Sequence, residues 1–212
     1  AQTSFAQGDT AAFAAGKPLV VAPGTYWSYS SGSTAILSGV LRETFDNARA
    51  YWRYPREKLF HPLGMRSAQV APDASGTLMG AAFLYASARD WARLGLLFLR
   101  DGTWAGEQIL PEGWSAYSTD PTPQSPKDEY GAQIWLKLTK SRDLGEPPMP
   151  ADSYYMLGHN GQAVAMVPSK DLVVVRLGQT PSGGSWDTAR ELGPLVNAFP
   201  DTKTQDARTQ DP

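Results

Sequence analysis

The spacing of apolar residues along the chain predicts several helices. After a Pro23-Gly24 turn, apolar residues recur at helical intervals from Ser33 to Phe45, so this stretch is expected to form an amphipathic helix. Comparable patterns predict helices over residues 10–15, 54–60, 88–99 and 186–199, and a short helix that contains Trp114.

Residues that begin and end helices sharpen these predictions. Asp9 is suited to cap the first helix, and Gly16 to end it in a left-handed conformation. Pro55 is tolerated near the start of the helix over residues 54–60, because its missing N–H costs little there. Ser87 and Asp90 have the spacing of a capping box, with aspartate in place of glutamate or glutamine.

Strand patterns gather toward the carboxyl end. The run from Leu172 to Leu177 is apolar except for Arg176, which is typical of a buried central strand. Further strands are expected over residues 130–138, 154–157 and 163–167.

Composition indicates a globular chain of one domain or two small ones. Of the 212 residues, 42% are hydrophobic and 19% are charged, which allows a sizeable core to be buried. The net charge is -2 and no basic stripe is present, so nucleic acid and anionic membranes are poor partners. No run approaches the roughly 20 apolar residues of a membrane span, and Ala1-Gln2-Thr3-Ser4 does not read as a signal peptide. The absent initiator Met suggests a processed amino end.

Metal and thiol chemistry are not expected. The chain has no cysteine, which removes disulfides, thiolate ligands and cysteine nucleophiles. Its two histidines, His61 and His159, are far apart in the sequence and lack a Glu-x-x-His partner. His61 precedes Pro62 and is interpreted as a helix-end residue. No metal or other cofactor is therefore predicted.

Two short segments suggest chemistry. The loop Trp27–Gly32 leads into a helix and would hold the Tyr29 hydroxyl in a fixed place, as a catalytic proton carrier requires. Taken alone, the loop is more simply interpreted as one in which Tyr29 packs under a turn. The segment Gly158–Gln162 lies between two predicted strands. If it continues an edge strand, His159 presents a polar side chain and the Gln162 N–H is directed into a cleft as an oxyanion donor. A glycine-rich strand end with a surface histidine is the alternative.

Five motifs in order resemble the serine β-lactamase-like hydrolase family, the group of class C β-lactamases, D-alanyl-D-alanine peptidases, related esterases and amino-oligomer amidases. They are Pro23-Gly24-x-x-Trp27-x-Tyr29-Ser30-Ser31-Gly32, Leu63-Gly64-Met65, Ser87-Ala88-Arg89-Asp90, the stretch from Trp104 to Trp114, and Gly158-His159-x-Gly161-Gln162. The resemblance spans about residues 10–198.

The resemblance implies an α/β (α+β) fold of the β-lactamase/transpeptidase type, with an antiparallel sheet flanked by helices plus a helical region. Residues 1–200 would form the C-terminal part of a single hydrolase domain, and residues 201–212 a disordered tail. It also implies a periplasmic or secreted location, leaving the cytoplasm open, and a small-molecule ester, amide or peptide substrate.

Residue roles follow from the same resemblance. Tyr29 matches the family's catalytic tyrosine, which exchanges a proton with the nucleophilic serine of a Ser-x-x-Lys motif and with the leaving group. Ser31 matches the third position of the tyrosine loop, and His159, Asn160 and Gly161 match the Lys-Thr-Gly-like strand that contacts the substrate. The Gln162 N–H would supply one oxyanion-hole donor.

The chain departs from the family pattern in three places. Ser31 replaces asparagine and His159 replaces the strand lysine, which favours ester or amide substrates over β-lactams. No Ser-x-x-Lys occurs anywhere in the 212 residues. We therefore expect the nucleophile to come from an N-terminal segment, separate or cleaved, that precedes this chain.

Two other functions remain open at this stage. A non-catalytic, truncated homologue that binds acyl or peptide ligands would also lack the serine. A tryptophan-rich glycan-binding domain would need several of the 7 tryptophans on an exposed face, whereas most lie within apolar helical patterns.

Overall fold

The computed structural model describes residues 7–138, 149–181, 184 and 186–202. The chain divides into two compact units, an amino-terminal unit of residues 1–90 and a carboxyl-terminal unit of residues 91–212, and each is described by itself. Residues 1–6 at the amino end and residues 203–212 of the predicted tail lie outside the described part of the chain.

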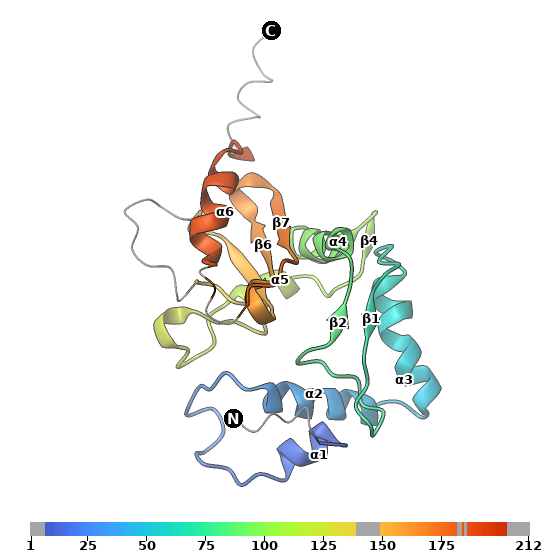
Figure 1. Cartoon of the computed structure of the whole chain (residues 1–212). Helices are drawn as coiled ribbons and strands as arrows, with labels where there is room; N and C mark the ends of the chain where they lie inside the picture. The colour runs from blue at the N-terminus through green and yellow to red at the C-terminus, as the bar shows by residue number, and fades with distance from the viewer. Residues whose placement is uncertain (1–6, 139–148, 182–183, 185, 203–212) are drawn as a thin grey trace. The chain divides into compact units, whose positions relative to one another are not determined.

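The amino-terminal unit is mainly helical (Figure 1). Its elements are α1 (Thr10–Ala15), α2 (Ser31–Glu43), α3 (Ala48–Pro55), the π-helix η2 (Arg56–Phe60) and the short antiparallel strands β1 (Gln69–Val70) and β2 (Leu84–Tyr85). Its most buried apolar side chains come from α3 and the segment after it: Tyr51, Phe60, Leu63, Met65 and Ala68.

Asp9 caps α1 as predicted, because its carboxylate accepts the Ala12 N–H at 2.8 Å. The expected left-handed end is wrong: Gly16 has a φ of -73° and stays in the right-handed region. The second helix begins at Ser31 instead of Ser33, because the Ser30 hydroxyl accepts the Gly32 N–H and acts as the cap.

The prediction of a helix over residues 54–60 is also wrong in its start. Helix α3 begins at Ala48, where the Asn47 side chain accepts the Ala50 N–H at 3.0 Å. Pro55 therefore ends α3 instead of starting a helix. The backbone continues from it as a π-helix, which accommodates the missing proline N–H. His61 caps that π-helix, which confirms it as a helix-end residue.

One carboxylate ties the first helix to a loop of this unit. The side chain of Asp73 accepts bonds from Thr10 N and Oγ1 at 2.9 and 2.8 Å, from Ser75 N and Oγ, and from Thr77 N at 3.0 Å. Burial alone would raise the pKa of Asp73, but these hydrogen bonds to the charged form lower it to about 2. Arg42 of α2 donates to the same loop, at Thr77 Oγ1.

The carboxyl-terminal unit contains a three-stranded antiparallel sheet in the order β5 (Tyr154–Leu157), β6 (Ala163–Val167) and β7 (Leu172–Arg176). Around it lie α4 (Ala88–Leu99), the hairpin of β3 (Thr103–Trp104) and β4 (Glu107–Gln108), α5 (Trp114–Thr119) and α6 (Thr188–Asn197). Short 3-10 turns occur at Pro126–Asp128, His159–Gly161 and Pro168–Lys170.

The sheet is covered on both faces, by α4 on one side and α6 on the other (Figure 1). Val164 and Met166 of β6 pack with Trp91 and Phe98 of α4, whereas Ala165 of the same strand packs with Leu192 of α6. Alternation along the strand explains this division. The expected antiparallel sheet flanked by helices is confirmed.

Two strand predictions are wrong. All five residues of β6 are buried and it pairs on both sides, so β6 is the central strand; β7 pairs with β6 and is only half-buried. Residues 130–138 do not form a strand. Gln133 has a φ of 65° and the segment folds back on itself, leaving only bridges from Trp135 to Tyr130 and Tyr155.

The capping box before α4 is only half formed. The Ser87 hydroxyl accepts the Asp90 N–H at 3.3 Å, as predicted. The Ser87 N–H, however, is donated to Ser67 Oγ at 2.8 Å, and Ser67 in turn donates through its N–H and hydroxyl to the Asp90 carboxylate. A serine from a distant loop therefore completes the cap.

Candidate active site

The tyrosine loop of the amino-terminal unit is fixed at both ends by local hydrogen bonds. At its start, Thr25 N and Oγ1 both donate to Ala22 O, which closes a turn around Gly24. At its end, Ser30 caps α2. Tyr29 directly precedes that cap and is 58% exposed. The sequence therefore places an accessible phenol immediately before a helix N-terminus, with Ser31 as the first residue of the helix.

The Gly158–Gln162 segment is the turn between β5 and β6, and the expectation that it continues a strand is wrong. His159–Gly161 form one 3-10 turn in which Asn160 and Gly161 have φ values of 57° and 80°. The turn is closed by Gly158 N donating to Gln162 O at 2.7 Å. His159 is exposed, while the three residues after it are half-buried.

The predicted oxyanion donor has an internal partner. The Gln162 N–H is donated to His159 O at 3.4 Å, the long end of hydrogen bonding, and the Gln162 side chain donates to the same oxygen at 3.2 Å. A bond this long is weak, so the N–H can be given up to a better acceptor. Its role in an oxyanion hole stays a prediction.

Arg176, which sequence reasoning did not single out, holds this turn in place. Its guanidinium donates to Gly161 O at 2.7 Å, to Gly178 O and to Thr180 Oγ1 at 2.9 Å, and it stacks on the ring of Trp186 at 3.8 Å. The Thr180 N–H adds a bond to Asn160 O at 2.8 Å. The half-buried Arg176 thus links the turn to residues 178–180, the stretch that follows β7.

Gly161 is required at this point for two reasons. Its φ of 80° suits glycine, and a Cβ there would lie 2.9 Å from the Trp186 ring and 3.1 Å from the Arg176 guanidinium. The second glycine of the motif is therefore explained by close packing as well as by conformation. These contacts make the turn a rigid element that presents His159 at the surface.

The structure brings together four of the predicted site residues, in the turn at positions 159–162. Tyr29 and Ser31 lie in the other unit, so their association with this turn stays a prediction. Trp91, Trp135 and Trp186 pack against the hydrophobic clusters of the carboxyl-terminal unit, which favours packing over glycan binding for these rings. Within the described residues, no helix is both long and apolar enough to cross a membrane.

Comparison with known proteins identifies the family. The model of the β-lactamase family matches residues 2–197. Solved structures that resemble the chain include a proposed 6-aminohexanoate-dimer hydrolase from Bacillus anthracis, with a TM-score of 0.64 and 22% identity over 87% of this chain and 48% of that one. A proposed β-lactamase from Bacteroides dorei has a TM-score of 0.61 and 16% identity, over 89% of this chain and 62% of the other.

A β-lactamase from Mycobacterium bovis has a TM-score of 0.59 and 20% identity, over 85% of this chain and 65% of the M. bovis chain. An uncharacterised protein of Alkalihalophilus pseudofirmus is 29% identical over 99 residues, which are 44% of this chain and 29% of that protein. The chain thus spans about half to two thirds of the solved structures. The fold is of the β-lactamase/transpeptidase type, with mixed helices and antiparallel sheets, and the chain belongs to the β-lactamase family.

Proposed function

We propose that this chain provides the tyrosine loop and the substrate-binding turn of a serine hydrolase that cleaves ester, amide or peptide bonds through an acyl-enzyme. The nucleophilic serine and its lysine are supplied by a segment outside these 212 residues. The observation that carries the proposal is the turn at His159–Gly161, which Arg176 and Thr180 hold rigidly between two strands. A preorganised turn is what electrostatic stabilisation of a transition state requires.

Each residue has a part in this mechanism. Tyr29 accepts the proton of the serine as it attacks the carbonyl carbon, and returns it to the leaving oxygen or nitrogen. A tyrosine, whose ordinary pKa is about 10, needs a cation beside it to do this near neutral pH, and the lysine of the supplied segment is that cation. His159 and Asn160 bind the polar end of the substrate, and Gln162 N–H donates to the developing oxyanion.

Two surfaces support a supplied segment. The α2 apolar face, formed by Ile36, Leu37, Val40 and Leu41, is exposed to between 38% and 59%. Within the described residues, β7 is paired along one edge only. Exposed apolar patches and apolar edge strands commonly mark binding surfaces. A segment that carries the serine and covers these surfaces would complete both the core and the site.

Substrate choice follows from two positions. His159 stands where the family has a lysine, and Ser31 where class C enzymes have asparagine, so the site offers a weaker anion-binding group than a β-lactamase. We propose short esters and amides as substrates, in a periplasmic or secreted setting.

The test is covalent labelling of the native preparation with a fluorophosphonate, followed by denaturing mass spectrometry. The expected result is an adduct on a serine upstream of Ala1, whether joined to this chain or co-purified with it, and loss of p-nitrophenyl ester hydrolysis in Tyr29→Phe. Tyr26→Phe, a neighbouring exposed tyrosine, is the control and should hydrolyse normally. An adduct on a serine within residues 1–212 would show that the nucleophile is not supplied from outside.

The absence of Ser-x-x-Lys specifically favours a second function, ligand binding without turnover. Under that function no adduct forms on any polypeptide of the preparation. Acyl-peptides would nevertheless bind, and would do so less tightly when His159 is changed to alanine.

A further inference from the structure

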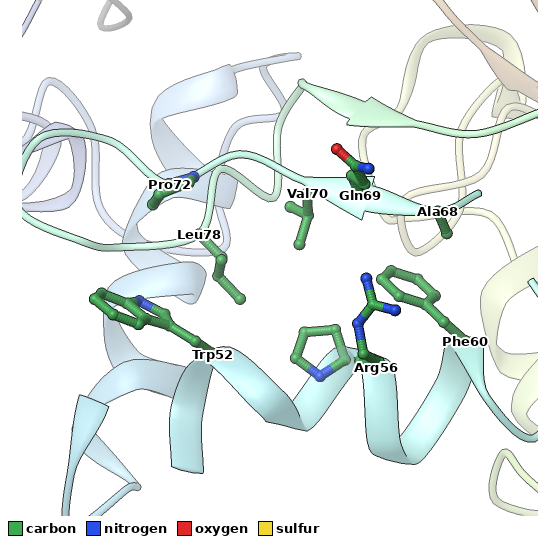
Figure 2. Close-up of a pocket in the computed structure, with 9 residues that line it drawn as sticks. Trp52, Arg56, Phe60, Ala68, Gln69, Val70, Pro72 and Leu78 are labelled. Carbon is green, nitrogen blue, oxygen red and sulfur yellow. The ribbon is translucent and has the colours of Figure 1, made fainter. Parts of the chain in front are cut away.

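The amino-terminal unit contains a groove that none of the predicted site residues lines. It lies between the helices α3 and η2 on one side and β1 with the following loop on the other, and has a volume of about 360 Å³ (Figure 2). Trp52, Phe60, Val70, Pro72 and Leu78 provide most of its apolar wall, and Arg56 adds a cation.

Hydrogen bonds between the two walls of the groove fix their relative positions. The Trp52 indole N–H donates to Gly76 O at 2.8 Å, and the Leu78 N–H donates to Tyr51 Oη at 2.8 Å. Pro72 and Leu78 also form a β-bridge. Figure 2 shows the side chains of Val70 and Leu78 directed from the strand side toward the helix, with Trp52 at one end. The apolar surface is therefore fixed by contacts to the backbone.

The charge of the groove is positive. Within the described residues, the Arg56 guanidinium takes part in no hydrogen bond or ion pair, and in Figure 2 it rises from the helix toward β1 beside the Phe60 ring. Arg53, three residues earlier near the end of α3, is instead paired with Glu57 at 2.5 Å. From position 48 to 66 the sequence has five basic residues, and Glu57 is the single acidic one.

We propose that this groove binds a small amphipathic carboxylate. Its aliphatic or aromatic chain lies along Trp52, Val70 and Leu78, and its carboxylate pairs with Arg56. Apolar pockets with one well-placed polar group are the usual form of small-molecule sites, and a guanidinium matches a carboxylate in both charge and shape. The site is separate from the residues proposed for hydrolysis and does not depend on them.

The experiment titrates octanoate into the 212-residue chain by calorimetry, and follows the tryptophan indole N–H signals by ¹⁵N–¹H NMR. The Trp52 signal is assigned through Trp52→Phe. Octanoate is expected to bind and to shift the Trp52 signal. Arg56→Gln should weaken octanoate about fivefold, the scale of an exposed ion pair, while binding of neutral octanamide changes less than twofold. Arg53→Gln, the matched control, should leave octanoate binding within twofold.

Three results would overturn the proposal. One is the absence of octanoate binding at several millimolar. Another is binding that leaves the Trp52 signal in place, as expected if octanoate adheres to the α2 apolar face. The third is an equal loss of octanoate and octanamide affinity in Arg56→Gln, which would mean that the variant disturbs the groove instead of removing its charge.

Discussion

The two units of the chain cover their apolar residues to very different degrees. In the carboxyl-terminal unit, Ala165, Met166 and Val167 of the central strand have no exposed surface, because a helix packs on each face of the sheet. In the amino-terminal unit, Leu37 and Val40 in the middle of the longest helix are 58% and 59% exposed. Both stretches have regular apolar patterns, yet only one of them forms a core.

The difference teaches that an amphipathic pattern predicts a face that needs a partner, without specifying where the partner lies. The carboxyl-terminal unit finds both partners of its sheet in its own sequence, in α4 and α6. The amino-terminal unit buries Tyr51, Leu63 and Met65 and has polar contacts around Asp73, but it leaves the apolar face of α2 exposed. The proposed function assigns the missing cover to the segment that carries the serine.

The largest expected effect is in the sheet. Met166→Ala removes a fully buried side chain from the cluster between β6 and α4, and should lower the free energy of unfolding by about 2–5 kcal/mol. Urea unfolding followed by near-UV circular dichroism measures this change. Leu37→Ala, which removes a similar volume from an exposed position, is the comparison. An equal loss in both variants would contradict the contrast between the units.

Strong base should also act on the sheet of the carboxyl-terminal unit. Burial, with the charges of Asp101 and Asp152, raises the pKa of Tyr154 to about 12, and burial raises that of Tyr155 to about 12. The ordinary value is 10.0, so the stabilisation from these neutral phenols is complete below pH 10 and is lost as the pH rises through 12. Absorbance at 295 nm should show their ionisation together with loss of the sheet signal. Full ionisation near pH 10 with the sheet intact would contradict this.

Acid should act on the amino-terminal unit through Asp73. Because its pKa is lowered to about 2 from 3.8, its stabilisation is complete above pH 4 and declines as the pH falls toward 2. Asp73→Asn should cost about 1–3 kcal/mol at pH 7, since the amide oxygen cannot satisfy all the donors from Thr10, Ser75 and Thr77. Asp9→Asn is the control, because asparagine also caps helices. Equal stability of both variants would contradict the stabilising role of the Asp73 hydrogen bonds.

A smaller and more local effect is expected at the His159–Gly161 turn. Arg176→Gln loses the bonds to Gly161 O and Thr180 Oγ1, so the Thr180 amide should exchange with solvent about tenfold faster. Global unfolding should change by only about 1 kcal/mol. Arg190→Gln, an exposed arginine on α6, should change neither quantity. In the proposed hydrolase, Arg176→Gln should raise KM for esters, since the turn proposed to bind substrate is loosened.

Much of the fold follows from local sequence signals. Strands β5 and β6 have the predicted bounds, and the residues that cap α1 and α4 are the predicted ones, because neighbouring residues determine both features. The start of α3 could also have been predicted from the sequence, since Asn47 is a good N-cap residue. Pro55 led instead to a predicted helix start at residue 54, because proline is common at helix starts as well as near helix ends.

Other features depend on contacts that leave no local signal. Strands β6 and β7 are similar apolar runs, and only the packing of two helices makes β6 central. Arg176 donates to the backbone carbonyl oxygens of residues 161 and 178. Because every residue type has a backbone carbonyl, the identities of these residues do not indicate an arginine partner. The Ser67 link to Asp90 joins residues 23 apart in sequence. The motif at 158–162 was found by its residue types, whereas its turn geometry required the structure.

The smallest expected effect is the sharpest test of the contrast between the units. Leu37→Ser and Val40→Ser should change the unfolding free energy of the isolated chain by less than about 0.5 kcal/mol, because both side chains already face solvent. Ala35→Leu, on the same helix at a position that is 7% exposed, should cost about 1–3 kcal/mol by overpacking. In the proposed hydrolase, where the serine-bearing segment covers α2, the two serine variants should become costly, since a covered face then acquires buried hydroxyls. If they destabilise the isolated chain as strongly as Ala35→Leu does, the α2 apolar face is covered within these 212 residues, and it no longer supports a segment supplied from outside.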